Sequence, residues 1–166
     1  YLAWSEFEYL EKLVKSDSEL AKKFNYNSRF MDDIAIPNFK GFGEIAKDIY
    51  HKDLILEPST SSGLSDTFLD LHIRVISNHF RIGIYHKVDD FDFDVINFPF
   101  PSSNIRTFEG PKTFYSQLIR FFRLCNNPKD FLFRANFTYR KLVSRGYSHS
   151  SLYKTFLKFT HSKKAH

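Results

Sequence analysis

The chain has 166 residues, a formal net charge of +5 and one cysteine, Cys125. That length suits one domain or two small ones, and a single cysteine excludes a disulfide framework and a cysteine-based zinc site. Hydrophobic residues make up 42% of the sequence, which is too many for a disordered chain. No apolar run approaches the ~20 residues that cross a bilayer. We therefore expect a globular intracellular protein, nuclear or cytoplasmic, without a membrane contact.

The charges are divided unevenly along the sequence. Residues 1–110 hold 12 Lys/Arg and 18 Asp/Glu, whereas residues 111–166 hold 12 Lys/Arg and a single acid, Asp130. This division predicts carboxylates that serve turns or a metal ion in the first part and a contact with a polyanion in the second. The sequence also begins at Tyr1, inside what reads as a helix, so we expect a piece of a longer polypeptide.

The first sixty residues predict helices around a β-hairpin. Residues 2–24 follow the helical period, and Asp17 or its neighbour Ser18 is expected to cap a second helix after a break. Residues 26–36 have the pattern of two short apolar strands joined by a turn. A short helix over 43–50 and a brief strand over 54–56 are expected to follow.

The second part predicts another hairpin and then helices. Residues 67–76 alternate between apolar and polar side chains and pair with 80–86 through a turn at 77–79. Beyond residue 111 the helical period returns, with Pro128 at the start of a second helix, Gly146 at its end, and Ser148 or Ser150 capping a third.

These elements define the expected fold class and division of the chain. The class is α+β, with a small antiparallel sheet and helices followed by an all-helical bundle. We expect a first domain over 1–87, an extended connector over 88–111 and a basic helical domain over 112–160.

The tetrapeptide Phe30-Met31-Asp32-Asp33 carries the clearest chemical signal. We expect Asp32 and Asp33 to form the turn of the first hairpin, where two adjacent carboxylates stand away from the sheet. Mg²⁺ or Mn²⁺ needs hard oxygen ligands, and one or two carboxylates with substrate phosphates suffice. The alternative is a turn with no metal, because Asp is common in turns.

The tetrapeptide lies within the stretch Arg29–Ile34, and further stretches follow it in a set order. They are Phe68–His72, Tyr85–Lys87, Asp89–Phe93, Asn97–Pro99, Ser103–Ile105 and Tyr115–Arg120. In this order the chain resembles the reverse transcriptases of eukaryotic retroelements, over about residues 2–160. The resemblance implies the palm and thumb portion of an RNA-directed DNA polymerase, which adds deoxynucleotides to a DNA primer on an RNA template.

The resemblance also implies residue roles. Asp32 would be the main metal ligand and Asp33 a supporting one in two-metal nucleotidyl transfer. Phe30 and Met31 would support the tip and the primer or nucleotide sugar, and Leu69 would belong to a hairpin that grips the primer. Two departures stand out. Phe30 replaces the usual Tyr, and the fingers and first half of the palm are missing, with another metal-binding aspartate. We therefore expect residues 1–166 alone to be inactive.

The basic end predicts a nucleic-acid contact without the resemblance, since few acids lie near these cations in the sequence. We assign phosphate contacts to Arg120, Arg123, Arg134, Arg140 and Lys141. The alternative is a solvated basic face.

Other interpretations stay open at this stage. The aromatic residues between these cations fit a helical core better than a base-stacking surface. The acidic run 89–94 either stays solvated or pairs with the basic helices. Two rival functions remain, which are a non-catalytic nucleic-acid-binding module derived from a polymerase and a protein-interaction domain.

Overall fold

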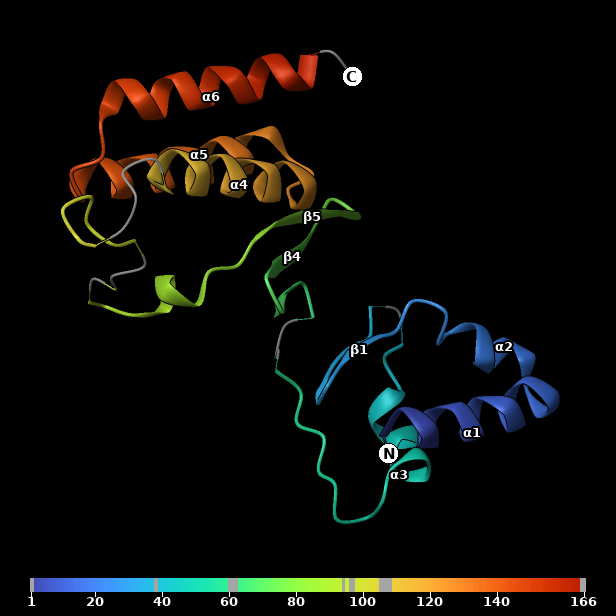
Figure 1. Ribbon diagram of the computed structural model, residues 1–166. Coiled ribbons are helices and arrows are strands. Elements are labelled where there is room, and N and C mark those ends of the chain that lie inside the picture. The colour runs from blue at the N-terminus through green and yellow to red at the C-terminus, as the bar shows by residue number, and fades with distance from the viewer. Residues whose placement is uncertain are drawn as a thin grey trace. The chain divides into compact units, whose positions relative to one another are not determined.

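The computed structural model describes residues 2–37, 39–59, 63–93, 95, 98–104 and 109–164. The chain forms two compact units, Tyr1–Ser61 and Ser62–His166, and Figure 1 shows their elements. Helices and two small antiparallel sheets make up the described residues, which confirms the predicted α+β class. None of the helices within these ranges has the length and apolar character that a membrane crossing requires.

The first unit places two strands among three helices. Its elements in chain order are α1 (Leu2–Ser16), α2 (Ser18–Lys22), β1 (Ser28–Phe30), β2 (Asp33–Ala35) and α3 (Phe42–Ile49). Strands β1 and β2 pair antiparallel, with Phe30 opposite Asp33. The predicted helices and hairpin are therefore present with small shifts in their bounds.

The break between α1 and α2 follows from a side-chain cap. The carboxylate of Asp17 accepts a hydrogen bond from the backbone N–H of Leu20 at 3.0 Å. This contact satisfies one of the amides that a helix start leaves without a partner. Of the two caps predicted for this helix, Asp17 and Ser18, the structure shows Asp17.

The core of the first unit is built on one face of α3. Phe42, Ala46, Ile49 and the following Tyr50 are buried there. The ring of Phe24, which follows α2, meets the ring of Phe42 edge-on with 5.9 Å between the centroids. Aromatic packing therefore attaches the helices to one another.

The predicted strand over 54–56 is wrong. Leu54, Ile55 and Leu56 form no strand and are largely exposed, with Ile55 82% accessible. Apolar residues of high strand propensity need a neighbouring strand to pair with, and no described strand pairs with this segment.

The second unit starts with a three-stranded meander. Its strands β3 (Ser65–Phe68), β4 (Leu71–Ile76) and β5 (His79–Ile84) pair in sequence order. The tight turn between β4 and β5 consists of Ser77 and Asn78, both with positive φ. This two-residue turn matches the right-handed twist of the strands, so His79 belongs to β5 and not to the predicted turn.

The predicted strand over 67–76 is in fact divided. Phe68 pairs with Leu71, so Leu69 and Asp70 form a turn between β3 and β4. Leu69 has a φ of 55°, in the left-handed region. Leu69 therefore sits in a turn and not on the apolar face of a continuous strand, and the period-2 pattern did not reveal this reversal.

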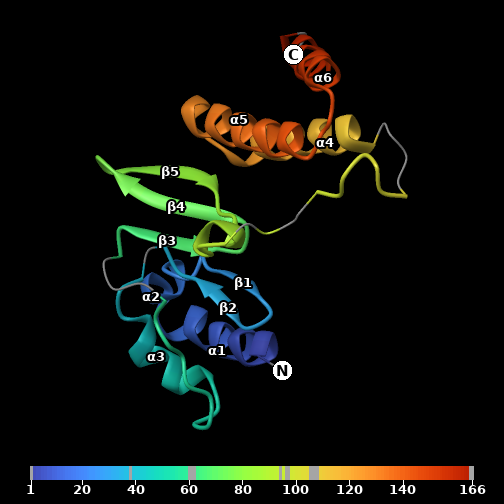
Figure 2. The same ribbon diagram turned by 90° about the vertical axis from the view of Figure 1, so that its left-hand side faces the viewer.

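A short 3₁₀ helix and three long helices complete the second unit. These are η1 (Lys87–Asp90), α4 (Glu109–Leu124), α5 (Pro128–Ser144) and α6 (His149–Lys164). Figures 1 and 2 show α4 and α5 together as a layer, with strand β5 on one side and α6 on the other. The predicted 88–111 connector thus overlaps η1 and the first turn of α4, and residues 94, 96–97 and 105–108 of it lie outside the described ranges.

The predicted starts and ends of these helices are confirmed. Asn127 accepts a hydrogen bond from the Lys129 N–H at 2.9 Å ahead of Pro128. Gly146 ends α5 with a φ of 92°, which favours glycine. The hydroxyl of Ser148 accepts from the Ser151 N–H, so Ser148 caps α6.

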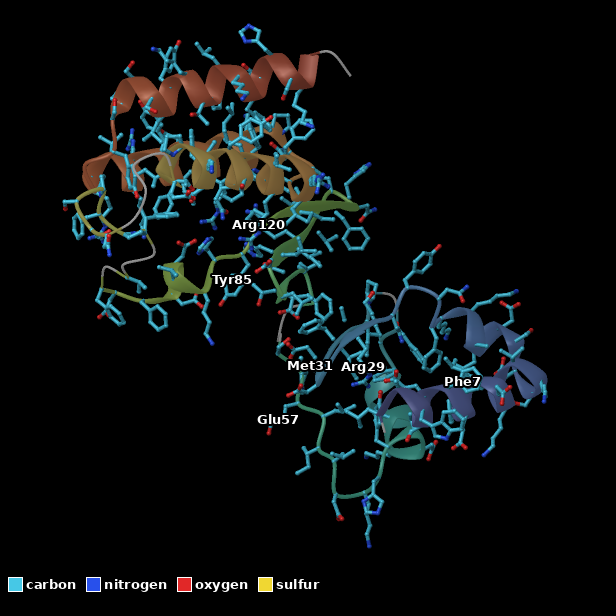
Figure 3. The ribbon with its side chains drawn as sticks, in the orientation of Figure 1. Phe7, Arg29, Met31, Glu57, Tyr85 and Arg120 are labelled. Carbon is cyan, nitrogen blue, oxygen red and sulfur yellow. The ribbon has the colours of Figure 1, made fainter. Side chains whose placement is uncertain are left out.

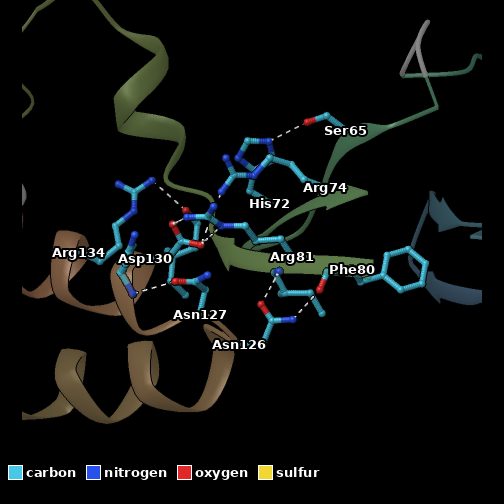
Figure 4. Close-up of polar contacts among 12 residues, drawn as sticks. Ser65, His72, Arg74, Phe80, Arg81, Asn126, Asn127, Asp130 and Arg134 are labelled. Atoms are coloured by element: carbon cyan, nitrogen blue, oxygen red, sulfur yellow. Dashed lines mark hydrogen bonds and ion pairs between the residues drawn. The ribbon is translucent and has the colours of Figure 1, made fainter. Parts of the chain in front are cut away.

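The layers of the second unit are joined by a polar cluster around one carboxylate (Figure 4). Asp130 in α5 accepts two hydrogen bonds from the Arg81 guanidinium of β5, at 2.8 and 2.7 Å. Arg74 of β4 lies 3.6 Å from the same carboxylate. The hydrogen bond from Arg81 holds the pKa of Asp130 below its usual range. The one acid of the basic region therefore ties the sheet to the helices.

The helical core is aliphatic and aromatic. Its most buried side chains come from all three long helices and are Phe114, Leu118, Phe121, Leu142, Leu152 and Phe159. Gly110, the second residue of α4, lies directly beneath the buried ring of Tyr147. A side chain at position 110 has no room there.

Candidate functional site

The Asp-Asp tip lies at the end of the first hairpin. Met31 and Asp32 form the two-residue turn, and Asp33 is the first residue of β2. The predicted turn pair Asp32-Asp33 is therefore shifted by one residue. Met31 takes the left-handed conformation, with a φ of 53°, which starts the reversal one position earlier.

Both carboxylates of the tip face solvent. Asp32 and Asp33 are exposed, and neither side chain makes a hydrogen bond or an ion pair with any residue that the structure describes. Phe30 is 49% and Met31 75% accessible, so the tip presents apolar side chains next to the acids. The exposed carboxylate oxygens could bind a cation, and the apolar side chains beside them could contact a ligand bound to that cation.

Arg29 anchors this tip to the helices (Figure 3). Its guanidinium donates to the backbone carbonyl of Met31 at 3.1 Å and, through Nε, to the carboxylate of Glu6 in α1 at 2.9 Å. Arg29 also donates to the hydroxyl of Tyr50 at 2.5 Å, and that hydroxyl donates to Glu6. One side chain thus connects the turn to α1 and to the residue after α3.

The network shifts the pKa values of its members. Burial raises the pKa of Glu6, but hydrogen bonds from Arg29 and Tyr50 outweigh it, so the pKa lies below the ordinary 4.5. Burial and the nearby Glu6 carboxylate raise the pKa of Tyr50. At neutral pH the network therefore consists of an ionised Glu6, a charged Arg29 and a neutral Tyr50.

This network predicts a pH-dependent stability of the first unit. Because the folded state lowers the pKa of Glu6, its contribution is present at neutral pH and is lost as the pH falls below 4.5 through the lowered value. Glu6→Gln should cost about 2 kcal/mol at pH 7, and less near pH ~3. Urea unfolding followed by the fluorescence of Trp4, the only tryptophan, measures this.

Glu11 supplies the matched control for that experiment. It lies on the same helix, is exposed, and has no hydrogen bond or ion pair with the described residues. Glu11→Gln should leave the free energy of unfolding nearly unchanged at both pH values. An equal loss in the Glu6 and Glu11 variants would show that the network does not stabilise the unit.

The tip fits a divalent cation in part. Two exposed carboxylates are the hard oxygen ligands that Mg²⁺ and Mn²⁺ take. Within the described residues no group of three or more His, Cys, Asp or Glu side chains is positioned to hold a metal. Asp32 and Asp33 can thus supply protein ligands, and the remaining ones must come from water, a bound phosphate or other protein segments.

Leu69, the residue predicted to contact the primer, lies in a different unit from the tip. Leu69 is 45% accessible in the turn between β3 and β4. Its neighbour Asp70 forms an ion pair with Arg120 of α4, with 2.6 Å between Nη2 and Oδ2. Leu69 is therefore available to a ligand, on a turn that α4 holds in place.

Arg120 and Arg134 pair with acids that lie far from them in the sequence. Arg120 pairs with Asp70, and Arg134 pairs with Asp89 at 2.5 Å and donates to the Ile84 carbonyl at 2.8 Å. These acids are 45 or more residues away in sequence and are brought close only by folding. The acidic run thus pairs with the basic helices through Asp89, as one alternative predicted.

The predicted basic residues separate into two groups. Arg123 and Arg140 are exposed on α4 and α5. Arg120, Arg134 and Lys141 instead line one pocket of about 310 Å³. The structure therefore brings three of the five predicted cations together.

The aromatic residues of the basic region are only partly core. Phe114 and Phe121 are buried, as predicted, but Phe122, Phe133 and Phe137 are exposed. The rings of Phe133 and Phe137 stack at 6.4 Å along α5. Cations lie over both rings, with Arg134 5.6 Å from the Phe133 centroid and Lys141 5.0 Å from the Phe137 centroid.

No family model, curated protein or solved structure matches the chain.

Most of the residues that support the candidate sites were not predicted. Glu6 and Tyr50 anchor the tip, and Asp70 holds Arg120 of the pocket. Asp89, which holds Arg134, belongs to the acidic run for which pairing with the basic helices was one predicted alternative. Each acts on a partner more than 20 residues away, so no local spacing signals it. The uneven charge along the chain was the only sign that acids and bases meet on folding.

Proposed function

We propose that this chain is the C-terminal palm and thumb part of an RNA-directed DNA polymerase of the reverse transcriptase kind. The observation that carries the proposal is the pair of exposed carboxylates, Asp32 and Asp33, on a hairpin tip that Arg29 anchors. The sequence resemblance of the surrounding stretches supplies the reaction. The partners would be an RNA template, a DNA primer and a deoxynucleoside triphosphate.

Each proposed residue has a role that its surroundings support. Asp32, in the turn, would be the main ligand of a divalent cation, and Asp33 would assist from the first position of β2. Phe30 and Met31 offer exposed apolar surface beside the acids, suited to a sugar. When bound, the cation would activate the primer hydroxyl and neutralise the leaving pyrophosphate.

The second unit would hold the primer–template duplex. Exposed Arg123 and Arg140 can contact phosphates, and such contacts recognise an A-like duplex by its backbone. The turn that carries Leu69 would lie at the primer end. In this proposal the polar contacts around Asp130 support the duplex-binding surface and do not take part in chemistry.

Primer extension tests the proposal. A polypeptide that also includes the upstream palm and fingers should extend a DNA primer on an RNA template with Mg²⁺ and deoxynucleotides. Residues 1–166 alone should not, because the proposed active site needs another aspartate from upstream. Extension by residues 1–166, or none by the longer polypeptide, would contradict the proposal.

The second candidate is a non-catalytic nucleic-acid-binding module. It is favoured by the absence, within the described residues, of a third acidic side chain close enough to complete a metal group. Under this reading the longer polypeptide binds a primer–template duplex in a salt-sensitive way but does not extend the primer. The same assay, with duplex binding measured in parallel, separates the two candidates.

A further inference from the structure

The second unit contains a polar pocket where three elements meet. Its wall includes His86 from the segment after β5, Gln117 and Arg120 from α4, and Arg134 and Lys141 from α5. Figure 3 shows Arg120 between α4 and the segment that follows β5. The pocket lies within one unit, so its geometry does not depend on the first unit.

The arginines of this pocket are held from outside it. Asp70 pairs with Arg120, and Asp89 pairs with Arg134, yet neither carboxylate is part of the pocket wall. A guanidinium has five N–H donors, and these ion pairs use only some of them. The two side chains are thus oriented in advance while further donors remain for a ligand, an arrangement suited to recognising an oxyanion.

Three cations of the pocket act on its histidine. Burial lowers the pKa of His86, and although Asp89 opposes this, the charges of Arg134, Arg120 and Lys141 lower it further. These three cations are therefore close enough to act on one ring. An anion that enters the pocket would compensate their charge.

We propose that this pocket binds a terminal phosphate group. A phosphomonoester carries about −1.5 to −2 charges at pH 7 and three acceptor oxygens, which matches Arg120, Arg134 and Lys141. A pocket admits such a group from one side, whereas the phosphate of a continuous strand has a sugar on both sides. Phe98, on the same wall, offers apolar surface for the carbon part of the ligand.

The phosphate could belong to the 5′ end of a nucleic acid or to a small phosphorylated molecule. Both present the same chemistry, and the experiment below distinguishes them. The inference does not rest on the proposed polymerase function, because it uses only residues of the second unit.

The test is an NMR titration of residues 1–166 with inorganic phosphate. The ring signals of His86 are followed across about pH 5 to 8, at increasing phosphate. The expected result is a saturable rise in the pKa of His86. Lys141→Met should weaken the apparent affinity about tenfold or more, whereas Lys154→Met, an exposed lysine of α6, should not.

A second titration identifies the source of the phosphate. A short oligonucleotide with a 5′-phosphate that binds at least tenfold tighter than inorganic phosphate and than its 5′-hydroxyl form indicates a nucleic-acid end. Equal affinity for that oligonucleotide and for inorganic phosphate, without binding of the 5′-hydroxyl form, indicates a small ligand. The proposal is overturned if phosphate leaves His86 unchanged, if Lys141→Met and Lys154→Met behave alike, or if the two oligonucleotide forms bind equally.

Discussion

If the proposed polymerase function is right, Asp32→Asn should abolish primer extension by a polypeptide that also includes the proposed upstream palm. The change keeps the size of the side chain but removes the negative charge that a divalent cation requires. Loss of metal assistance worth ~4 kcal/mol lowers the rate about a thousandfold. The measurement is the initial rate of extension of a labelled primer on an RNA template with Mg²⁺. Duplex binding should stay intact, since Asp32 is exposed and holds no other residue in place.

Asp48 provides the control for this substitution. It is an exposed acid of α3 in the same unit, so Asp48→Asn removes one charge without touching the tip. Extension by this variant should stay within twofold or so of the unchanged protein. A variant at Asp32 that keeps more than a tenth of the activity would contradict the role assigned to the tip.

Gly110→Ala should be the most destabilising single-methyl change in the second unit. A Cβ atom at position 110 would lie 2.2 Å from two ring carbons of Tyr147. That ring is only 7% accessible, so it cannot turn into solvent without opening the core. Overpacking of this kind costs about 3 kcal/mol, and urea unfolding followed by the helical circular dichroism signal measures it.

Gly43 makes the matched comparison, since both glycines are the second residue of their helix. A Cβ at Gly43 meets nothing within 4 Å, and alanine favours a helix over glycine by up to ~1 kcal/mol. Gly43→Ala should therefore be neutral or stabilising. If Gly110→Ala behaved in the same way, the close packing of Tyr147 on α4 would be wrong.

Local patterns predicted most elements because their causes are local. The cap at Asp17, the proline start of α5 and the glycine end at Gly146 each depend on contacts within a few residues. The α+β class followed from the order of these elements. The hairpin that carries the Asp-Asp pair was also predicted in place.

The errors of sequence reasoning have two physical origins. The turns at Met31 and Leu69 use left-handed backbone at residues that rarely adopt it, so composition gives no sign of them. The strand predicted over 54–56 has no neighbour to pair with, and local propensity cannot supply one.

The candidate sites were only half predictable, because their supporting contacts join residues that are far apart in the sequence. The acids of the tip are adjacent in the sequence, so their pairing was predictable. The hydrogen-bond network that anchors the tip instead links Glu6, Arg29 and Tyr50, which are far apart in the sequence. The pocket likewise depends on Asp70 and Asp89 meeting arginines far along the chain. Pairings at such separations follow from tertiary packing, which a single sequence does not specify.

Paramagnetic broadening by Mn²⁺ tests most directly whether the hairpin tip binds divalent cations. In ¹⁵N-labelled residues 1–166, the amide signals of residues 30–34 should weaken at lower Mn²⁺ than those near the acidic cluster Asp89–Asp90. Excess Mg²⁺ should restore them, and the double variant Asp32→Asn, Asp33→Asn should remove the effect. Equal broadening around both acidic sites, or a double variant that responds like the unchanged protein, would contradict the account.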